Sequence, residues 1–115
     1  MRRVAACALV MLLAAGAASA HHGWSGYDTQ IRTLAGTVES LRYESPHVML
    51  GLKAADGSRT VVLAPPSRMQ ARGLPDGAIK VGDAVTVEGY AHRTETQEMR
   101  AERIRVGDGQ SVELR

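Results

Sequence analysis

Residues 33–43 read TLAGTVESLRY, and their pattern is the main evidence for the predicted fold. Its first half places Leu34, Gly36 and Val38 on one face of a strand, because successive side chains of a strand point to opposite faces. The alternation then changes phase, which predicts a β-bulge near residues 39–40. A glycine inside such a strand is typical of a barrel strand that turns a corner. We therefore predict one long, bent strand over 33–43.

The chain that follows predicts further strands separated by turn signals. Val48, Leu50 and Leu52 alternate after a break at Ser45-Pro46, and Asp56-Gly57 is typical of a tight turn between two strands. The later predicted strands cover 47–53, 58–64, 84–90 and 99–106, with a last pairing segment at 111–114. Residues 67–72 form the predicted helix, with Met69 as its buried residue and Gly73 as its C-terminal cap.

Five strands with one short helix between the third and fourth are typical of the OB-fold, a small all-β Greek-key barrel. A β-sandwich of five or six strands is the alternative. An OB-fold binds ligands on the outer face of its second and third strands and on the loops that join strands 1 to 2 and 4 to 5. His47 follows the first of these loops and His92 precedes the second, so both are candidate binding residues.

Residues 1–20 have the pattern of a cleavable export signal. Arg2 and Arg3 give a cationic start, residues 4–18 are almost all apolar, and Ala18-Ser19-Ala20 is a small-x-small cleavage pattern. The apolar run is shorter than the roughly 20 residues that a membrane span needs. We expect Sec-type secretion to the periplasm and no membrane insertion after cleavage. The mature chain would then begin with residues 21–31 as an extended arm, followed by the barrel domain at 32–115.

Cleavage also changes the charge and composition of the protein. The whole chain has 14 Lys and Arg residues against 12 Asp and Glu, and the signal contains two of the arginines and the single cysteine, Cys7. The mature chain is then close to neutral and has one Trp, three Tyr and no Phe. Nucleic-acid binding proteins usually carry a cationic track and stacking aromatic side chains. The composition therefore predicts no nucleic-acid partner, and the loss of cysteine predicts neither a disulfide nor a thiolate metal site.

The four histidines of the chain predict a metal site. A mature chain that starts with His21 offers its α-amine and its imidazole as one chelate, and His22 adds a second imidazole. If the arm folds over the outer face of the barrel, His47 and His92 complete a nitrogen-rich site suited to Cu(II). Met49 shares a strand face with His47 and supplies a thioether for Cu(I). Zinc and nickel are weaker candidates than copper.

The sequence offers no specific catalytic set, since no Ser-His-Asp group, His-Glu-x-x-His helix or paired-carboxylate motif can be assembled. We expect a protein without enzymatic activity that sequesters copper or delivers it to a periplasmic protein partner. Three carboxylates near the predicted loops could support the ligands: Glu44, Glu95 and Glu98. The alternative is a metal-free envelope module that binds a peptide, glycan or protein in the barrel groove. The histidines would then be solvated, and Met49 would be a packing residue.

Several segments of the chain resemble one known family. They are the HHGW start at 21–24, the TLAGTVE strand, the Ser-Pro-His turn, the APPSRMQARG segment and the EMRAERI strand. Together they resemble an uncharacterised family of small exported bacterial proteins, catalogued as domain of unknown function family 6152. The family more often has Asn where this chain has Ser45, whereas His21, His22, Gly23, Pro46 and His47 match its pattern. The resemblance implies export and the fold, and it implies no particular activity.

Overall fold

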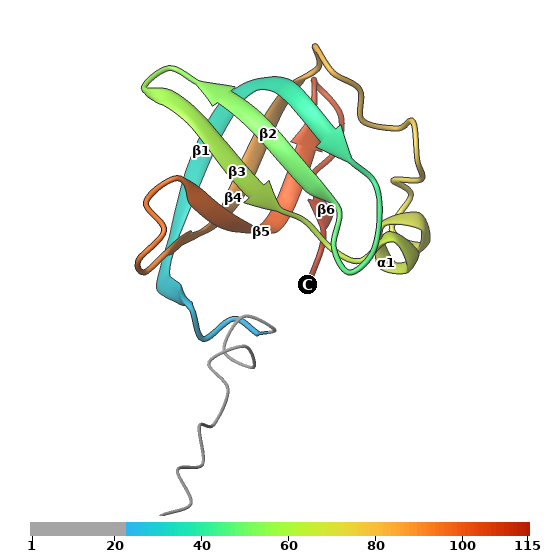
Figure 1. Cartoon of the computed structure of the whole chain (residues 1–115). Coiled ribbons are helices and arrows are strands. Elements are labelled where there is room, and N and C mark those ends of the chain that lie inside the picture. Colours follow the sequence, from blue (N-terminus) through green and yellow to red (C-terminus); the bar gives the residue numbers. More distant parts are fainter. Residues whose placement is uncertain (1–22) are drawn as a thin grey trace, which may run out of the picture.

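Six strands and one helix follow one another along residues 23–115, the part of the chain that the computed structural model describes (Figure 1). The elements are β1 (Tyr27–Arg42), β2 (Met49–Ala54), β3 (Gly57–Val62), α1 (Pro66–Ala71), β4 (Ala84–His92), β5 (Glu98–Val106) and β6 (Val112–Glu113). The strand order is β3-β2-β1-β4-β5-β6, and a parallel pairing of β3 with β5 closes the ring. The predicted OB-like barrel with a short helix between β3 and β4 is therefore confirmed.

β1 is the strand around which the barrel closes, because it pairs with β2 along one half and with β4 along the other. Its register with β2 shifts between Val38 and Ser40, which confirms the predicted bulge. A side chain at Gly36 would collide with the carbonyl oxygen of Lys53. Glycine at this position therefore lets β1 and β2 approach closely where the strand bends.

The start of β1 corrects one expectation. Residues 27–31 were predicted to belong to the extended arm, but β1 begins at Tyr27, which pairs with His92 of β4. Tyr27 is buried, whereas residues 29–33 are exposed on both faces of the strand. A strand that is solvated on both faces has no hydrophobic alternation, so the pattern of the sequence could not reveal it.

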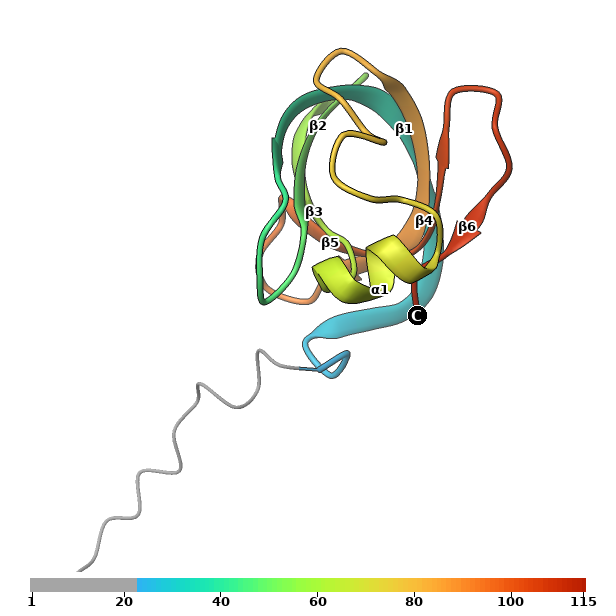
Figure 2. The same ribbon diagram turned by 90° about the vertical axis from the view of Figure 1, so that its right-hand side faces the viewer.

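Aliphatic side chains from alternate strand positions fill the barrel. Leu50 and Leu52 of β2 are fully buried, as the alternation predicts. α1 adds the fully buried Met69 and lies with the following segment across one open end of the ring (Figure 2). Because Leu50 faces the core, its neighbour Met49 faces the outside of the barrel.

Residues 1–22 lie outside the described residues, so the export signal, the cleavage after Ala20 and the positions of His21 and His22 stay predictions. Within residues 23–115, no helix combines the length and the apolar character that a membrane crossing requires.

Candidate ligand and metal site

A cavity of about 300 Å³ lies on the outer face of the barrel, between the loop that joins β1 to β2 and the start of β5. One row of paired residues crosses the sheet beneath it. Arg42 pairs with Met49, Met49 with Val62, and Val62 with Arg100. Paired residues of neighbouring strands present their side chains on the same face. This row thus brings one residue from each of four strands to the lining of the cavity.

Three of the five predicted metal ligands line this cavity. His47 comes from the loop before β2, Met49 from β2, and His92 from the end of β4. The structure therefore brings these three side chains to one place, whereas His21 and His22 are not among the described residues. Within residues 23–115, no group of three or more His, Cys, Asp or Glu side chains is arranged to hold a metal ion.

Arg100 is the most buried charged group of the cavity, with 9 % of its surface exposed. Its Nη1 donates a hydrogen bond of 3.1 Å to the carbonyl oxygen of Gly23, and its guanidinium lies 4.2 Å from the centroid of the Trp24 ring. Burial lowers the pKa of Arg100. No ion pair within the described part of the chain includes this guanidinium. Arg100 therefore ties the N-terminal segment to the barrel through neutral groups.

His47 contacts Arg100 inside the cavity, with 3.4 Å between Nε2 of the imidazole and Nη2 of the guanidinium. An arginine side chain can only donate hydrogen bonds, so the lone pair of Nε2 faces the guanidinium. A ring nitrogen of His47 is therefore unprotonated in this arrangement. This is the form of imidazole that a metal ion binds.

The imidazole of His92 caps the loop between β4 and β5. Its Nδ1 accepts the backbone N–H of Thr94 at 3.2 Å and that of Glu95 at 2.9 Å. The proton of the neutral ring is then on Nε2, which lies 3.8 Å from Oε2 of Glu98. A metal ion at Nε2 would have to displace this proton, so the geometry suits a structural role better than ligation.

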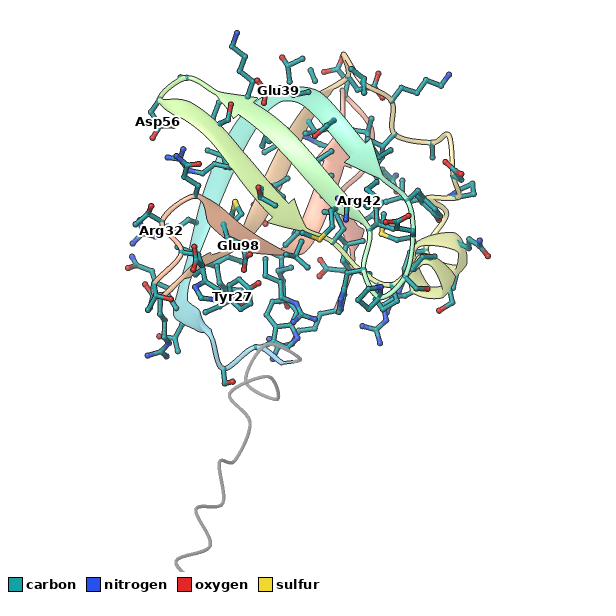
Figure 3. The ribbon with its side chains drawn as sticks, in the orientation of Figure 1. Tyr27, Arg32, Glu39, Arg42, Asp56 and Glu98 are labelled. Atoms are coloured by element: carbon teal, nitrogen blue, oxygen red, sulfur yellow. The ribbon has the colours of Figure 1, made fainter. Side chains whose placement is uncertain are left out.

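Tyr27 and Glu98 form a second polar pair in the cavity and lie side by side in Figure 3. The Tyr27 hydroxyl donates a hydrogen bond of 2.5 Å to Oε2 of Glu98. Its ring meets the His92 ring edge-on, with 5.0 Å between the centroids. Burial raises the pKa of Tyr27, and the hydrogen bond to Glu98 acts in the same direction. The phenol therefore stays protonated and serves as a fixed hydrogen-bond donor.

Sequence reasoning placed Glu98 near a loop and gave no role to Tyr27 or Arg100. A signal for Arg100 was present, because Glu98 and Arg100 lie on either side of Met99, which is buried in the core. The alternation of side chains along a strand, which placed Met49 outside the barrel, also puts Glu98 and Arg100 on the outer face. No comparable signal marked Tyr27, because its strand has no alternating pattern.

The family of unknown function DUF6152 has a sequence model that matches residues 8–100 of this chain. The chain belongs to this family. No curated protein matches the DUF6152 protein.

Solved structures share its fold. TiaS in complex with a tRNA, AMPCPP and agmatine matches with a TM-score of 0.54 and 21 % identity, over 70 % of this chain and 19 % of that chain. A ZRD-deleted mutant of TiaS with agmatine matches with a TM-score of 0.53 and 19 % identity, over 74 % of this chain and 26 % of that chain. The mitochondrial single-stranded DNA binding protein Rim1 of S. cerevisiae matches with a TM-score of 0.51 and 15 % identity, over 72 % of this chain and 99 % of that chain. The DUF6152 protein thus spans about a fifth of TiaS, and these likenesses show the fold alone.

These structures correct the expectation of no nucleic-acid partner. That expectation rested on the near-neutral charge and the few aromatic residues of the predicted mature chain. Rim1 is a single-stranded DNA binding protein and TiaS is seen with tRNA, so the same fold occurs in proteins of this kind. Composition averages over the whole chain, whereas recognition uses one face of a barrel. Composition therefore does not exclude nucleic acid for this fold.

Proposed function

We propose that this protein binds copper at its mature N-terminus, with His47 as a ligand from the barrel, and that it sequesters or delivers the ion in the periplasm. One observation carries the proposal. The guanidinium of Arg100 holds the carbonyl oxygen of Gly23 at 3.1 Å through one nitrogen and lies 3.4 Å from His47 through the other. The segment that leads to the predicted mature N-terminus is thus fixed beside an imidazole of the cavity.

The length of chain before Gly23 suits this role. Cleavage after Ala20 would leave His21 and His22 as the two residues ahead of Gly23, and two residues span at most about 7 Å. The α-amine and imidazole of His21 would therefore be within reach of the cavity that His47 lines. The predicted signal and the contacts of Gly23 support the same location for a site.

The donor set favours copper. An α-amine and imidazoles are nitrogen ligands, and Cu(II) binds such sites more tightly than the other divalent first-row metals. Nε2 of His47 lies beside Arg100 in the lining of the cavity, and the thioether of Met49 lines the same cavity as a ligand suited to Cu(I). We assign ligation to His21, His22 and His47, with Met49 serving the reduced ion. His92 shapes the neighbouring loop instead.

Arg100 makes the proposed site reversible. A metal ion at Nε2 of His47 would replace the guanidinium as the partner of that nitrogen. The positive charge of a buried guanidinium opposes a cation nearby, because charges interact strongly in a poorly solvated site. This repulsion limits the affinity and favours release, which suits a protein that delivers its ion.

The test compares copper binding by three altered forms of the protein with binding by the unchanged protein, each secreted by its own signal and purified without a tag. Cu(II) is titrated against a competing chelator, and the spectrum of the bound ion is recorded by electron paramagnetic resonance. An alanine inserted before His21, or the substitution His47→Ala, should weaken binding about tenfold or more, since each removes a ligand. His92→Asn, which removes an imidazole from the same cavity, is the matched control and should change affinity less than about twofold. Unchanged affinity and spectrum in both the insertion form and His47→Ala would show that the proposed site is wrong.

A further inference from the structure

The cavity contains two opposite charges that do not pair with each other. Arg100 and Glu98 are two residues apart on β5, so their side chains leave the same face of the strand about 7 Å apart. Among the ion pairs of residues 23–115, none joins them. The guanidinium is held instead by the carbonyl of Gly23 and the ring of Trp24, and the carboxylate by the hydroxyl of Tyr27.

Both groups keep hydrogen-bonding capacity that the described part of the protein does not use. A guanidinium has five N–H groups, and within residues 23–115 those of Arg100 reach only Gly23 and His47. Oε2 of Glu98 accepts the Tyr27 hydroxyl, whereas Oε1 has no hydrogen-bond partner in the same part of the chain. These unused groups are not sealed from solvent, because among the described residues the buried side-chain atom without a partner is Oε2 of Glu102. A ligand that enters the cavity can therefore reach them, and hydrogen bonds to charged groups are stronger than those between neutral groups.

The charge balance of the lining selects the kind of ligand. Two arginines and two glutamates line the cavity: Arg42, Arg100, Glu44 and Glu98. Arg42 and Glu44 are largely exposed and pair with each other, with 3.4 Å between Nε and Oε1. The two other charges, of opposite sign, are those of Arg100 and Glu98. A molecule that carries one charge of each sign can pair with Arg100 at one end and with Glu98 at the other. The cavity therefore matches a zwitterion.

The size of the cavity and its apolar lining further restrict the kind of ligand that fits. Its volume of about 300 Å³ is at the lower end of the range for small-molecule pockets. Pro46, Met49 and Val62 give the lining an apolar part, and Val62 pairs directly with Arg100 across the sheet. A small aliphatic group can therefore pack beside the charged pair.

We propose that this cavity binds a free amino acid with an aliphatic side chain. Its carboxylate pairs with Arg100, its ammonium group pairs with Glu98, and its side chain packs against Met49 and Val62. This site requires no metal ion, so it goes beyond the proposed copper function and does not depend on it.

The test is isothermal titration calorimetry of the metal-free protein, secreted by its own signal, with L-leucine as the probe. EDTA is present throughout, because an amino acid chelates copper by itself. N-acetyl-L-leucine lacks the ammonium group, and L-leucinamide lacks the carboxylate. Each should bind about tenfold more weakly than L-leucine or worse, as expected when one charge-assisted hydrogen bond is lost. If L-leucine does not bind, or binds no better than both derivatives, the proposal is wrong.

Variants locate the binding site. Glu98→Gln and Arg100→Met should each weaken L-leucine binding about tenfold or more, since each removes one charged partner. Arg105→Met is the control, because Arg105 is an exposed arginine of the same strand that does not line this cavity. Thermal melts confirm that each variant folds. Equal affinity of all three variants and the unchanged protein would overturn the assignment, whatever the outcome of the copper titration.

Discussion

The hydroxyl of Tyr27 donates a hydrogen bond of 2.5 Å to Oε2 of Glu98, which joins the first residue of β1 to the first residue of β5. The two residues are 71 positions apart in the sequence. The acceptor is a carboxylate and Tyr27 is only 8 % exposed, so the bond is of the strong, charge-assisted kind. It fixes the end of the barrel where the candidate cavity lies.

Removal of this hydroxyl should cost stability. Tyr27→Phe keeps the ring and leaves Glu98 without its donor, so we expect the free energy of unfolding to fall by about 1.5–3 kcal/mol. Urea denaturation followed by circular dichroism measures the change. Tyr90→Phe is the matched control, because it also removes a hydroxyl but keeps the edge-on contact between the rings of Tyr90 and Trp24. It should cost less than about 0.5 kcal/mol. Equal losses in the two variants would contradict this role for Tyr27.

The raised pKa of Tyr27 also predicts how stability changes with pH. The folded protein holds the phenol protonated above its ordinary pKa of 10.0. The contribution of Tyr27 is therefore complete below about pH 10, the unfolded pKa, and is lost as the pH rises above it. Above pH 10 the stability of the unchanged protein should fall more steeply than that of Tyr27→Phe, by up to about 1.4 kcal/mol per pH unit. Urea denaturation at several alkaline pH values measures the two slopes, and parallel slopes would exclude the effect.

The loop between β4 and β5 should depend on an acceptor at position 92. His92→Ala leaves the backbone N–H groups of Thr94 and Glu95 without Nδ1, and we expect a loss of about 1–2 kcal/mol. His92→Asn places a carbonyl oxygen near the same position and should restore most of the loss. Urea denaturation gives the free energies, and amide hydrogen exchange at the two N–H groups reports the loop directly. A variant with Asn as unstable as the one with Ala would mean that the cap is unimportant.

Trp24 should report and support copper binding. Its ring lies 4.2 Å from the guanidinium of Arg100 and 4.5 Å from that of Arg115, and such contacts contribute roughly 0.5–2 kcal/mol each. Trp24 is the single tryptophan of the chain, so Cu(II) bound near Gly23 should quench the tryptophan fluorescence. Trp24→Leu should weaken Cu(II) binding severalfold, because the segment that leads to His21 is held less firmly, and Trp24→Phe should be intermediate. Fluorescence and chelator competition measure the two effects. Full affinity in Trp24→Leu would show that the ring does not position the N-terminus.

The pairing of β4 with β5 should tolerate only glycine at position 89. A Cβ at Gly89 would collide with the backbone carbonyl of Arg100, and the neighbouring strand cannot move away without breaking its pairing. Gly89→Ala should therefore lower the free energy of unfolding by about 3 kcal/mol or more. Gly23→Ala is the control, with little change expected, because its new Cβ meets no atom of the described residues within 4 Å. Thermal and urea denaturation compare the two variants.

The fold was largely predictable from the sequence because its signals are local. Alternation over residues 48–52 indicated a buried face, the change of phase in TLAGTVESLRY indicated the bulge, and Asp56-Gly57 indicated the turn. Each signal depends on neighbours within a few positions, where strand geometry dictates which side chains face the core. The sequence missed the start of β1, because the exposed side chains there carry no such pattern.

The candidate site was predictable only in part. Strand alternation and the position of the loops predicted His47, Met49 and His92 near one surface, and in the structure these three residues line one cavity. Alternation along the strand could not predict that Nδ1 of His92 accepts two backbone N–H groups, because these contacts depend on the conformation of the loop.

Alternation along the strands was enough to identify core residues such as Leu50 and Leu52, because the period of a strand sets which side chains face inward. It did not identify Tyr27 and Arg100 as buried. Which outward-facing residues meet depends on how distant strands pair. Closure of the barrel through β3 and β5 places Val62 beside Arg100 and so sets a buried guanidinium among Gly23, Trp24 and His47. Core positions within a strand follow from local alternation, whereas a site of charges depends on pairings between strands that lie far apart in the chain.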